Sequence, residues 1–255
     1  MNYLKHYLKL FFSWLPRNYI IYRFSKKYIS VYENFSYEPN YNGEALLLDA
    51  LKGFQFRVIF DAGANVGLWT DRATQHFPEA EIHSFELSKT TFDSLVSRCG
   101  HKTRVFLNNF GLSDHNGEVK YIDYGENSGL NTLVTSTTFH DAEKPSQHKR
   151  ALVFSGDHYC EKHGIRAIDF LKIDVEGGEN LVLGGFHQML DSGQIKVIQF
   201  EYGYINGDSK FLMRDFFNFF EEKGYVIGPL KSTGVIFSDF HYCFNNFNSG
   251  PNFVA

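Results

Sequence analysis

Short apolar runs and amphipathic stretches follow one another along most of the chain. Residues 58–60, Val-Ile-Phe, have no polar alternation, which is typical of a central parallel strand buried on both faces. Further strands are predicted at residues 81–85, 103–107, 167–175 and 196–200. Helical spacing predicts helices at residues 45–51, 68–77, 91–99, 157–163, 179–190 and 209–223. The alternation predicts an α/β fold with a doubly wound, mostly parallel sheet and helices on both faces.

Less regular segments complete the pattern. Residues 225–227, 235–237 and 252–255 offer strands for a closing antiparallel hairpin. Residues 118–122 alternate like a short strand and open a polar stretch that runs to Arg150. A loop this long inside a compact domain is usually a binding lid or disordered, so residues 134–150 are the candidate mobile segment. Asp157 is the expected N-cap of the helix that follows.

The turn after the first strand indicates a site for a nucleoside-bearing cofactor. Asp61 ends the strand, at the edge where open α/β sheets place their ligands. Gly63 and Gly67 allow positive φ and close approach of a ligand to the main chain, and Asn65 tolerates the left-handed region best among other residues. Glu86 ends the next strand, roughly 20 residues after the turn, where an acid accepts hydrogen bonds from a ribose. The G-x-G-x-x-G spacing of dinucleotide sites is absent, which argues against nicotinamide and flavin.

Carboxylates gather at the ends of the fourth and fifth strands. By the two-residue period of a strand, Lys172, Asp174 and Glu176 project to one side. Grouped acids raise one another's pKa and yield a general base, although Lys172 opposes this. Glu201 ends the fifth strand, and it either accepts a proton from a substrate hydroxyl, orients a sugar ring, joins Asp174 around a divalent ion, or is only a solvated strand terminus. Glu179 is explained as an acid in the first turn of a helix.

Two aromatic side chains follow Glu201 directly. Tyr202 and Tyr204 stand near the expected site, and a sugar ring held between them is one interpretation of this segment. Aromatic residues make up 17 % of the chain, so many of them must belong to the core instead.

Charge is spread unevenly along the chain. The formal net charge of −4 over 255 residues gives no general attraction to phosphate backbones, so nucleic acid is a poor candidate for the acceptor. Residues 1–32 carry six basic residues and no acidic one, which leaves 19 basic and 29 acidic residues, a net −10, in the remainder. Such asymmetry suggests a separate role for the N-terminal segment.

The basic segment has the pattern of an amphipathic helix. Apolar and aromatic residues recur at helical spacing, at Tyr3, Tyr7, Leu10, Phe11 and Trp14. Such a helix either lies on an anionic membrane surface or packs on the domain or on a second subunit. It is too short to span a membrane and lacks the features of a signal peptide.

Cysteine and histidine usage indicates no metal centre and a reducing compartment. The three cysteines, Cys99, Cys160 and Cys243, are widely spaced, so neither a disulfide framework nor a zinc knuckle is implied. The histidines form no H-E-x-x-H motif, and most are expected at the surface. A cytoplasmic setting fits.

Three segments together carry a resemblance to a known family. They are Asp61-Ala-Gly-Ala-Asn-Val-Gly67, Gly111-Leu-Ser-Asp114, and Leu171-Lys-Ile-Asp-Val-Glu-Gly-Gly-Glu179. In order and spacing they resemble FkbM-family S-adenosylmethionine-dependent methyltransferases over about residues 40–255. The resemblance implies a class I, Rossmann-like fold with a seven-stranded sheet, and usually O-methylation of sugar or natural-product hydroxyls. Two departures stand out: Gly156-Asp157 replaces a Leu-Asp pair, and residues 127–133 match the family's serine-rich segment only loosely.

The resemblance also implies roles for individual residues. Gly63, Asn65 and Gly67, with Asp61 before them, would shape the methionine and ribose pocket, and Glu86 would bind the ribose hydroxyls. Gly111 and Leu112 would flank the adenine, and Asp174 would face the methionine or the transferring methyl. An alcohol loses its proton during attack, which needs a base within about 3 Å of its oxygen. Asp174 and Glu201 are the first candidates for that base, with Glu176 next.

The expected function is methyl transfer from S-adenosylmethionine to a hydroxyl of a sugar in a polysaccharide or lipid-linked glycan. A small natural product or a protein as the acceptor, and a cofactor-binding protein without catalysis, are the alternatives. A divalent metal is compatible with the acids but no motif indicates one. The domain boundaries are expected at residues 1–40 for the basic arm and 41–255 for the catalytic domain, in a cytoplasmic protein whose arm touches a membrane surface or another subunit.

Overall fold

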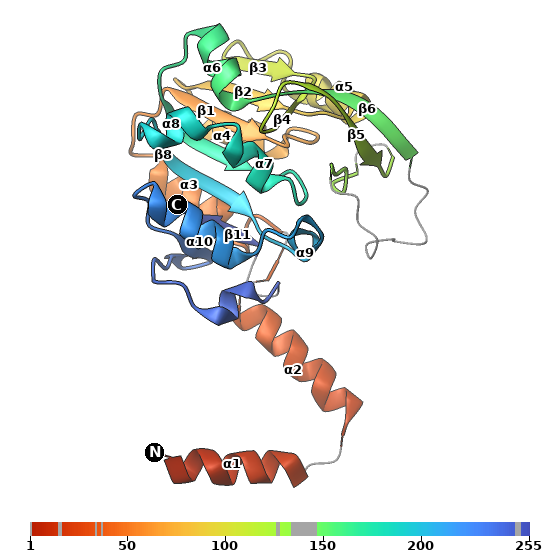
Figure 1. Cartoon of the computed structure of the whole chain (residues 1–255), viewed down its shortest axis with the longest axis vertical. Helices are drawn as coiled ribbons and strands as arrows, with labels where there is room; N and C mark the ends of the chain where they lie inside the picture. The colour runs from red at the N-terminus through yellow and green to blue at the C-terminus, as the bar shows by residue number, and fades with distance from the viewer. Residues whose placement is uncertain are drawn as a thin grey trace.

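A central, mostly parallel sheet organises the chain (Figure 1). The computed structural model describes residues 2–14, 17–33, 35–36, 38–125, 128–133, 147–247 and 251–255. The parallel strands are β1 (Val58–Ala62), β2 (Glu81–Phe85), β3 (Val105–Asn108), β7 (Ile168–Ile173) and β8 (Ile195–Glu201). Three strands, β9 (Gly228–Lys231), β10 (Gly234–Val235) and β11 (Asn252–Val254), extend the sheet with antiparallel pairing.

The strand order places the carboxyl ends of β1 and β7 side by side. In space the order is β10-β9-β11-β8-β7-β1-β2-β3, so the chain winds outward from β1 to β3 and then returns to β7. The reversal between β1 and β7 is a topological switch point, where open α/β sheets bind ligands. The predicted doubly wound fold is therefore confirmed. The described sheet has eight strands instead of seven, and β10, only two residues long, stands at its edge.

Helices cover both faces of the sheet, as predicted. On one face lie α3 (Glu44–Leu51), α4 (Leu68–His76) and α5 (Lys89–Cys99); on the other lie α6 (Gly156–His163), α7 (Glu179–Gly184), α8 (His187–Asp191) and α10 (Met213–Glu222). Ile59 packs with the first group and its neighbour Phe60 with the second, and both are fully buried. This two-sided burial explains why the β1 segment has no polar alternation.

Several predicted boundaries are wrong for local reasons. The single helix expected at residues 179–190 is two helices, because the chain turns at Gly185, where a Cβ atom would stand 2.0 Å from the Ser113 carbonyl oxygen. The helix expected at residues 209–223 begins only at Met213, after the short α9 (Ile205–Ser209). Residues 225–227 are not in a strand, and the last hairpin strand ends at Val235.

Asp157 does not cap its own helix. Ser155 is the N-cap of α6, and its hydroxyl accepts from the His158 N–H. The Asp157 carboxylate instead accepts from the N–H groups of Gln188 and Met189, in the first turn of α8. Asp157 thus satisfies free N–H groups at the start of a different helix, and the sequence around Asp157 carries no signal for this contact.

The replacement of the family's leucine by Gly156 has a structural counterpart. A Cβ atom at Gly156 would meet the Phe186 ring at 2.2 Å. Phe186 is fully buried and fills the space that a larger side chain at position 156 would need. A leucine at position 156 would therefore collide with Phe186 in this core.

A small second sheet forms the other side of the site. It joins β4 (Gly111–Leu112), β5 (Gly117–Asp123) and β6 (Gln147–Phe154) in the order β4-β6-β5. The predicted strand at residues 118–122 is confirmed. The predicted mobile segment is wrong for residues 147–150, which pair with β5, and its remainder, residues 134–146, lies outside the described residues.

Two helices precede the domain and stand away from it (Figure 1). They are α1 (Asn2–Trp14), which confirms the predicted amphipathic helix, and α2 (Tyr19–Tyr32). Lys231 fixes the end of this arm by donating to the carbonyl oxygen of Glu33 at 2.7 Å and to its carboxylate at 3.1 Å. In the described part of the chain, none of the helices has the length and apolar content needed to cross a bilayer.

Candidate functional site

The turn between β1 and α4 is built for close approach to its neighbours. Gly63 has φ +83°, and a Cβ atom there would lie 1.8 Å from the Asp174 carbonyl oxygen, so only glycine fits. Asn65 has φ 49°, which agrees with the left-handed conformation predicted for it. Through this contact the turn lies against the end of β7, and Asp174 donates its N–H to the Ala62 carbonyl oxygen at 2.9 Å.

Glu86 is fixed beside the same turn. Its carboxylate accepts from the N–H of Asn65 at 3.0 Å and from the N–H of Ser88 at 2.8 Å. The side chain is buried, and burial raises the pKa of Glu86 to about 7 against the lowering effect of these two bonds. Each carboxylate oxygen accepts one of these two bonds and keeps a lone pair for a ligand hydroxyl.

Most of the predicted cofactor residues line one cavity of about 200 Å³, here called the first cavity. Gly63, Asn65, Glu86, Gly111, Leu112 and Asp174 all contribute to its wall. The segment of residues 128–133, which matched the family only loosely, supplies a further side of the wall through Ser128, Gly129, Asn131 and Leu133. Because this segment matched the family's serine-rich segment only loosely, its residues were not predicted to belong to the site, although the tertiary structure brings them there.

Two predicted cofactor residues lie elsewhere. Asp61 is fully buried behind the turn, where it accepts from the Thr70 hydroxyl at 2.6 Å and lies 3.7 Å from the Lys172 ammonium. Burial raises the pKa of Asp61, and Lys172 opposes that rise. Gly67 begins α4, and a Cβ atom there would meet the Leu95 side chain at 2.7 Å. Both residues support the turn and line neither the first cavity nor the one beside it.

A second cavity, of about 290 Å³, adjoins the first. Its wall is formed by residues after β7 and β8, and it includes Glu179, Gly203, Tyr204, Ile205 and Asn206. Gly129, Glu176 and Glu201 line both cavities. The two spaces therefore meet at a wall that carries two carboxylates.

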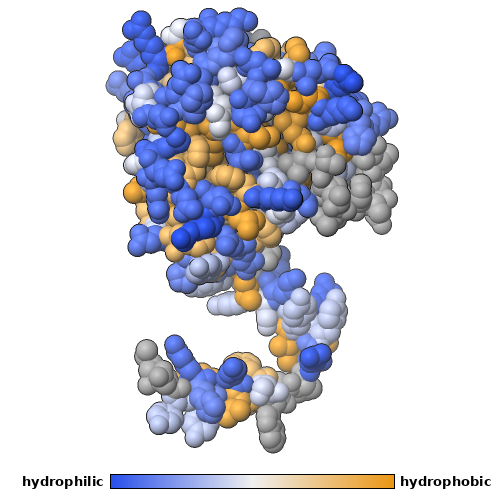
Figure 2. Space-filling model, viewed as in Figure 1, coloured by the Kyte–Doolittle hydropathy of each residue, from blue (hydrophilic) through white to orange (hydrophobic). Residues whose placement is uncertain are grey.

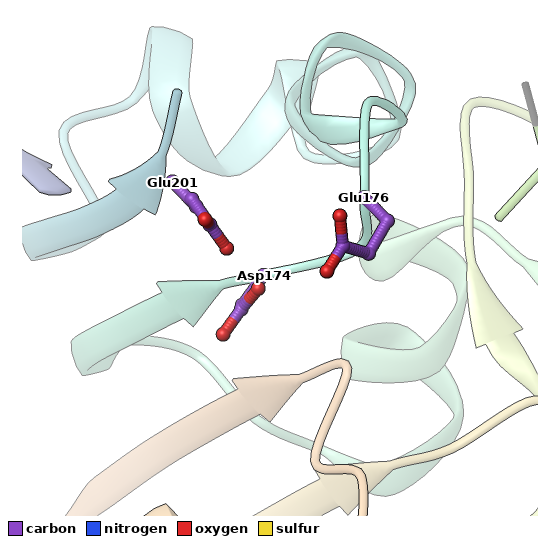
Figure 3. Close-up of side chains that lie close together, drawn as sticks. All are labelled: Asp174, Glu176 and Glu201. Atoms are coloured by element: carbon purple, nitrogen blue, oxygen red, sulfur yellow. The ribbon is translucent and has the colours of Figure 1, made fainter. Parts of the chain in front are cut away.

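Asp174, Glu176 and Glu201 converge at this junction (Figure 3). One oxygen from each of the three carboxylates lies within 4.8 Å of the others. Of these two cavities Asp174 lines the first and not the second, so the cluster has one carboxylate on that side and two at the junction. The sequence prediction that these side chains meet at one sheet edge is confirmed.

The pKa values of the three carboxylates are shifted in different directions. Lys172 donates to Asp174 at 2.9 Å, and its charge holds the pKa of Asp174 below the usual range although burial opposes this. Burial, and then the neighbouring Asp174 charge, raise the pKa values of Glu201 and Glu176 well above their ordinary value. Glu201 and Asp174 share a hydrogen bond, which lowers the pKa of Asp174 and raises that of Glu201.

Lys172 is the buried counter-ion of the site. Its side chain is 5 % exposed, and the Asp174 and Asp61 charges raise the pKa of Lys172 against the cost of burial. The stem lies against the Trp69 ring, with Nζ 5.7 Å from the ring centroid. The oxygen atoms of the three acids are ligands that suit a divalent cation. The Lys172 ammonium already places one positive charge beside the same cluster.

Glu176 is held in a strained backbone conformation. Its φ of 54° is in the left-handed region, which is uncommon for a residue other than glycine or asparagine. The Thr132 hydroxyl donates to the Glu176 carbonyl oxygen at 2.5 Å and joins this loop to the segment of residues 128–133. The strain is located at one of the two residues whose carboxylates lie at the junction of the two cavities.

Glu179 braces the same loop. Its carboxylate accepts from the N–H groups of Val175 and Gly177 at 3.2 and 3.1 Å, and from the Asn206 side chain at 2.9 Å. Burial raises the pKa of Glu179 to about 7. Glu179 is therefore more than an acid in the first turn of α7, because it ties the loop after β7 to α9. Sequence gave no signal for Asn206, whose role depends on contacts across the fold.

The two tyrosines after Glu201 have different environments. Tyr202 is 1 % exposed and packs against the rings of Phe216, Phe247 and Phe253, so the prediction that it stacks on a sugar is wrong. Tyr204 is 44 % exposed and lines the second cavity. One aromatic ring, not a pair, faces this cavity from the segment after β8.

Comparison with known proteins places this arrangement among methyltransferases. Residues 61–227 match a family model described as "Methyltransferase FkbM domain". The 2-O-methyltransferase NoeI of Sinorhizobium fredii (strain NBRC 101917 / NGR234) is 24 % identical over 142 residues, which cover 52 % of this chain and 58 % of NoeI. Among solved structures, methyltransferase FkbM from Methylobacillus flagellatus KT has a TM-score of 0.51 at 14 % identity, over 85 % of this chain and 50 % of that one. The chain thus spans little more than half the length of either relative, and the structural likeness shows the fold.

Proposed function

Because the chain belongs to the FkbM family of S-adenosylmethionine-dependent methyltransferases, we propose that it transfers a methyl group from S-adenosylmethionine to a hydroxyl of a sugar. The observation that carries this proposal is the junction of the two cavities, where three carboxylates converge. A methyl-transfer site needs one space for the donor, another for the acceptor, and a proton acceptor between them.

The first cavity suits the cofactor. Glu86 presents a buried carboxylate with free lone pairs for the ribose hydroxyls, and Gly63 brings the turn into the wall of the cavity. Gly111 and Leu112 line the wall expected beside the adenine. S-adenosylmethionine supplies a methyl group on a cationic sulfur. The ionised Asp174, which lines this cavity, favours a cationic group there.

The second cavity suits the acceptor. Tyr204 offers an apolar ring face against which a sugar ring can pack, and Asn206 and the glutamates offer hydrogen-bonding groups to hydroxyls. The net charge of −10 outside the basic arm opposes a polyanionic acceptor such as nucleic acid. NoeI is a 2-O-methyltransferase by name, which supports oxygen as the methylated atom.

Glu176 is the residue best placed to take the acceptor's proton. It lines both cavities, and its raised pKa makes it a stronger proton acceptor than Asp174, whose pKa is lowered. Glu201 shares a hydrogen bond with Asp174 and therefore orients that carboxylate. S-adenosylmethionine would supply the methyl group, whose bond to sulfur breaks as the bond to the acceptor oxygen forms, with S-adenosylhomocysteine as the other product. Glu176 would take the hydroxyl proton, and Asp174 would remain ionised beside Lys172.

The catalytic unit is proposed to be residues 41–255, acting in the cytoplasm. The test supplies methyl-labelled S-adenosylmethionine with a panel of glycans, small natural products and proteins. The proposal predicts label in a sugar ether, together with S-adenosylhomocysteine. Label in another acceptor class would replace the sugar with that class, and cofactor binding without turnover on any acceptor would support a non-catalytic binding protein.

Two substitutions separate the roles of the acids. Glu176→Gln should lower kcat about 10²- to 10⁴-fold, the usual contribution of a general base, while S-adenosylmethionine still binds. Asp174→Asn should weaken cofactor binding as well. An unchanged kcat in Glu176→Gln would remove Glu176 as the base.

A further inference from the structure

The arm formed by α1 and α2 carries more exposed apolar surface than the domain needs. Among the described residues, sixteen of the twenty-nine exposed large hydrophobic side chains lie between Tyr3 and Tyr32. They include Tyr3 at 82 % exposure, Phe24 at 73 % and Tyr32 at 74 %. Figure 2 shows apolar side chains at the surface of both helices. Apolar surface of this extent marks a site of association.

Each helix separates its apolar and basic residues onto opposite faces. At 100° per residue, the polar residues of α1 fall within roughly one third of its circumference. These are Lys5, His6, Lys9 and Ser13. In α2 the three basic residues, Arg23, Lys26 and Lys27, share one face with Ser30, and the opposite face holds Phe24 and Tyr28. Basic amphipathic helices of this kind lie in the plane of a membrane interface.

Charge selects among the surfaces that would cover the arm. Residues 1–32 carry six basic residues and no acidic one, so two arms from different copies would repel each other. The domain is acidic, and among the described residues it carries thirteen of the twenty-nine exposed large hydrophobic side chains, fewer than the much shorter arm. An anionic lipid surface supplies both negative charge and an apolar interior. We infer that the arm docks the enzyme on an anionic membrane surface.

This docking is independent of the proposed chemistry but suits it. The arm joins the domain next to Lys231, and neither of its helices lines either cavity of the site. A lipid-linked glycan would then be presented to an enzyme held at the same surface. Loss of docking therefore leaves methyl transfer to a water-soluble acceptor unchanged, and loss of catalysis leaves docking unchanged.

Flotation of the full chain with vesicles tests the inference. The protein should float with vesicles of phosphatidylcholine and phosphatidylserine, remain largely free with phosphatidylcholine alone, and dissociate as salt rises. The triple variant Arg23→Gln/Lys26→Gln/Lys27→Gln should bind the anionic vesicles about a hundredfold more weakly, because each basic residue near such a surface contributes about a fivefold factor. Phe11→Gln/Phe24→Gln should also weaken binding, because both side chains lie on apolar faces.

A matched control keeps the test specific. Lys52→Gln/Lys120→Gln/Lys162→Gln removes the same charge from exposed positions of the domain and should bind as the unaltered chain does. Equal binding to neutral vesicles, or no effect of the arm substitutions, would overturn the inference. A third outcome would also overturn it: the unaltered chain does not bind vesicles and sediments as a dimer, whereas the arm variants sediment as monomers. That result would show that the arm binds a second copy of the chain. S-adenosylmethionine binding, measured in parallel, should be the same in every variant.

Discussion

Replacing Lys172 with methionine tests the electrostatic design of the site. The substitution keeps the unbranched stem beside Trp69 and removes the ammonium that lies 2.9 Å from Asp174 and 3.7 Å from Asp61. Asp61 is fully buried, and after the substitution the Thr70 hydroxyl is its remaining short partner, at 2.6 Å. A carboxylate left in this position without a counter-ion is costly because it is removed from water.

The expected loss follows from the burial of both partners. Lys172 is 5 % exposed and Asp61 is 0 % exposed, so solvent screens their interaction little. Breaking a buried ion pair by removing one partner costs about 3–5 kcal/mol. For a domain of this size that loss lowers the Tm by about 6–20 °C. The exposed pair Lys89–Asp93 provides a control, and Lys89→Met should cost less than about 1 kcal/mol.

The loss should depend on pH, with a definite sign. Lys172 depresses the folded-state pKa of Asp174. The interaction of the two groups therefore stabilises the fold fully above the unfolded-state pKa of Asp174, about 4, and this stabilisation is lost as pH falls through the depressed folded-state pKa. Without Lys172, the folded-state pKa values of Asp174 and Asp61 both rise. The variant should therefore lose most stability at neutral pH and less near pH 4, where these carboxyls are protonated when folded.

Urea denaturation followed by circular dichroism at the two pH values measures this difference. Adding Asp61→Asn to Lys172→Met should recover part of the loss at neutral pH, because it removes the charge left without a partner. A loss below about 1 kcal/mol at neutral pH, or one equal at both pH values, would show that Lys172 does not balance these acids.

The remaining predictions concern the walls of the two cavities. Burial raises the pKa of Glu86 to about 7, and ribose hydroxyls donate to its ionised form, so the affinity for S-adenosylmethionine should fall about tenfold from pH 8 to pH 6 in calorimetry. Glu86→Gln should bind the cofactor weakly and lose this pH dependence, and an unaltered pH dependence in the variant would refute this role. Gly63→Ala should abolish cofactor binding and lower the Tm because its Cβ atom would collide with the Asp174 carbonyl group, whereas Gly53→Ala, which meets nothing within 4 Å, should do neither in calorimetry and thermal melts. Tyr204→Ala should raise the KM for the glycan and leave cofactor affinity unchanged, and equal effects on both ligands would remove Tyr204 from the acceptor wall.

Local patterns predicted the parts of the fold that local physics determines. The continuous apolar run before Asp61 requires burial on both faces, and the glycines and Asn65 that follow require an unusual backbone, so strand, turn and helix could be placed from residues 58–77 alone. The meeting of Asp174 and Glu201 followed from the rule that parallel strands end at one edge.

What sequence could not supply depends on contacts between distant segments. Asp61 and Tyr202 are residue types that often occur in functional sites. Both side chains nevertheless point into the interior, and only tertiary packing decides that direction. The pairing of β6 with β5 spans a stretch without local signal, so residues 147–150 resembled a loop. Asn206 joins the site through Glu179, 27 positions earlier in the chain, and no periodicity relates the two.

The central claim is that donor and acceptor meet at the carboxylates between the two cavities. A crystal structure of the full chain with S-adenosylhomocysteine tests it most directly. The ribose hydroxyls should lie at Glu86 and the sulfur beside Asp174, facing the cavity that Tyr204 lines. A sulfur atom remote from Asp174, Glu176 and Glu201, or a ligand bound outside the first cavity, would contradict it.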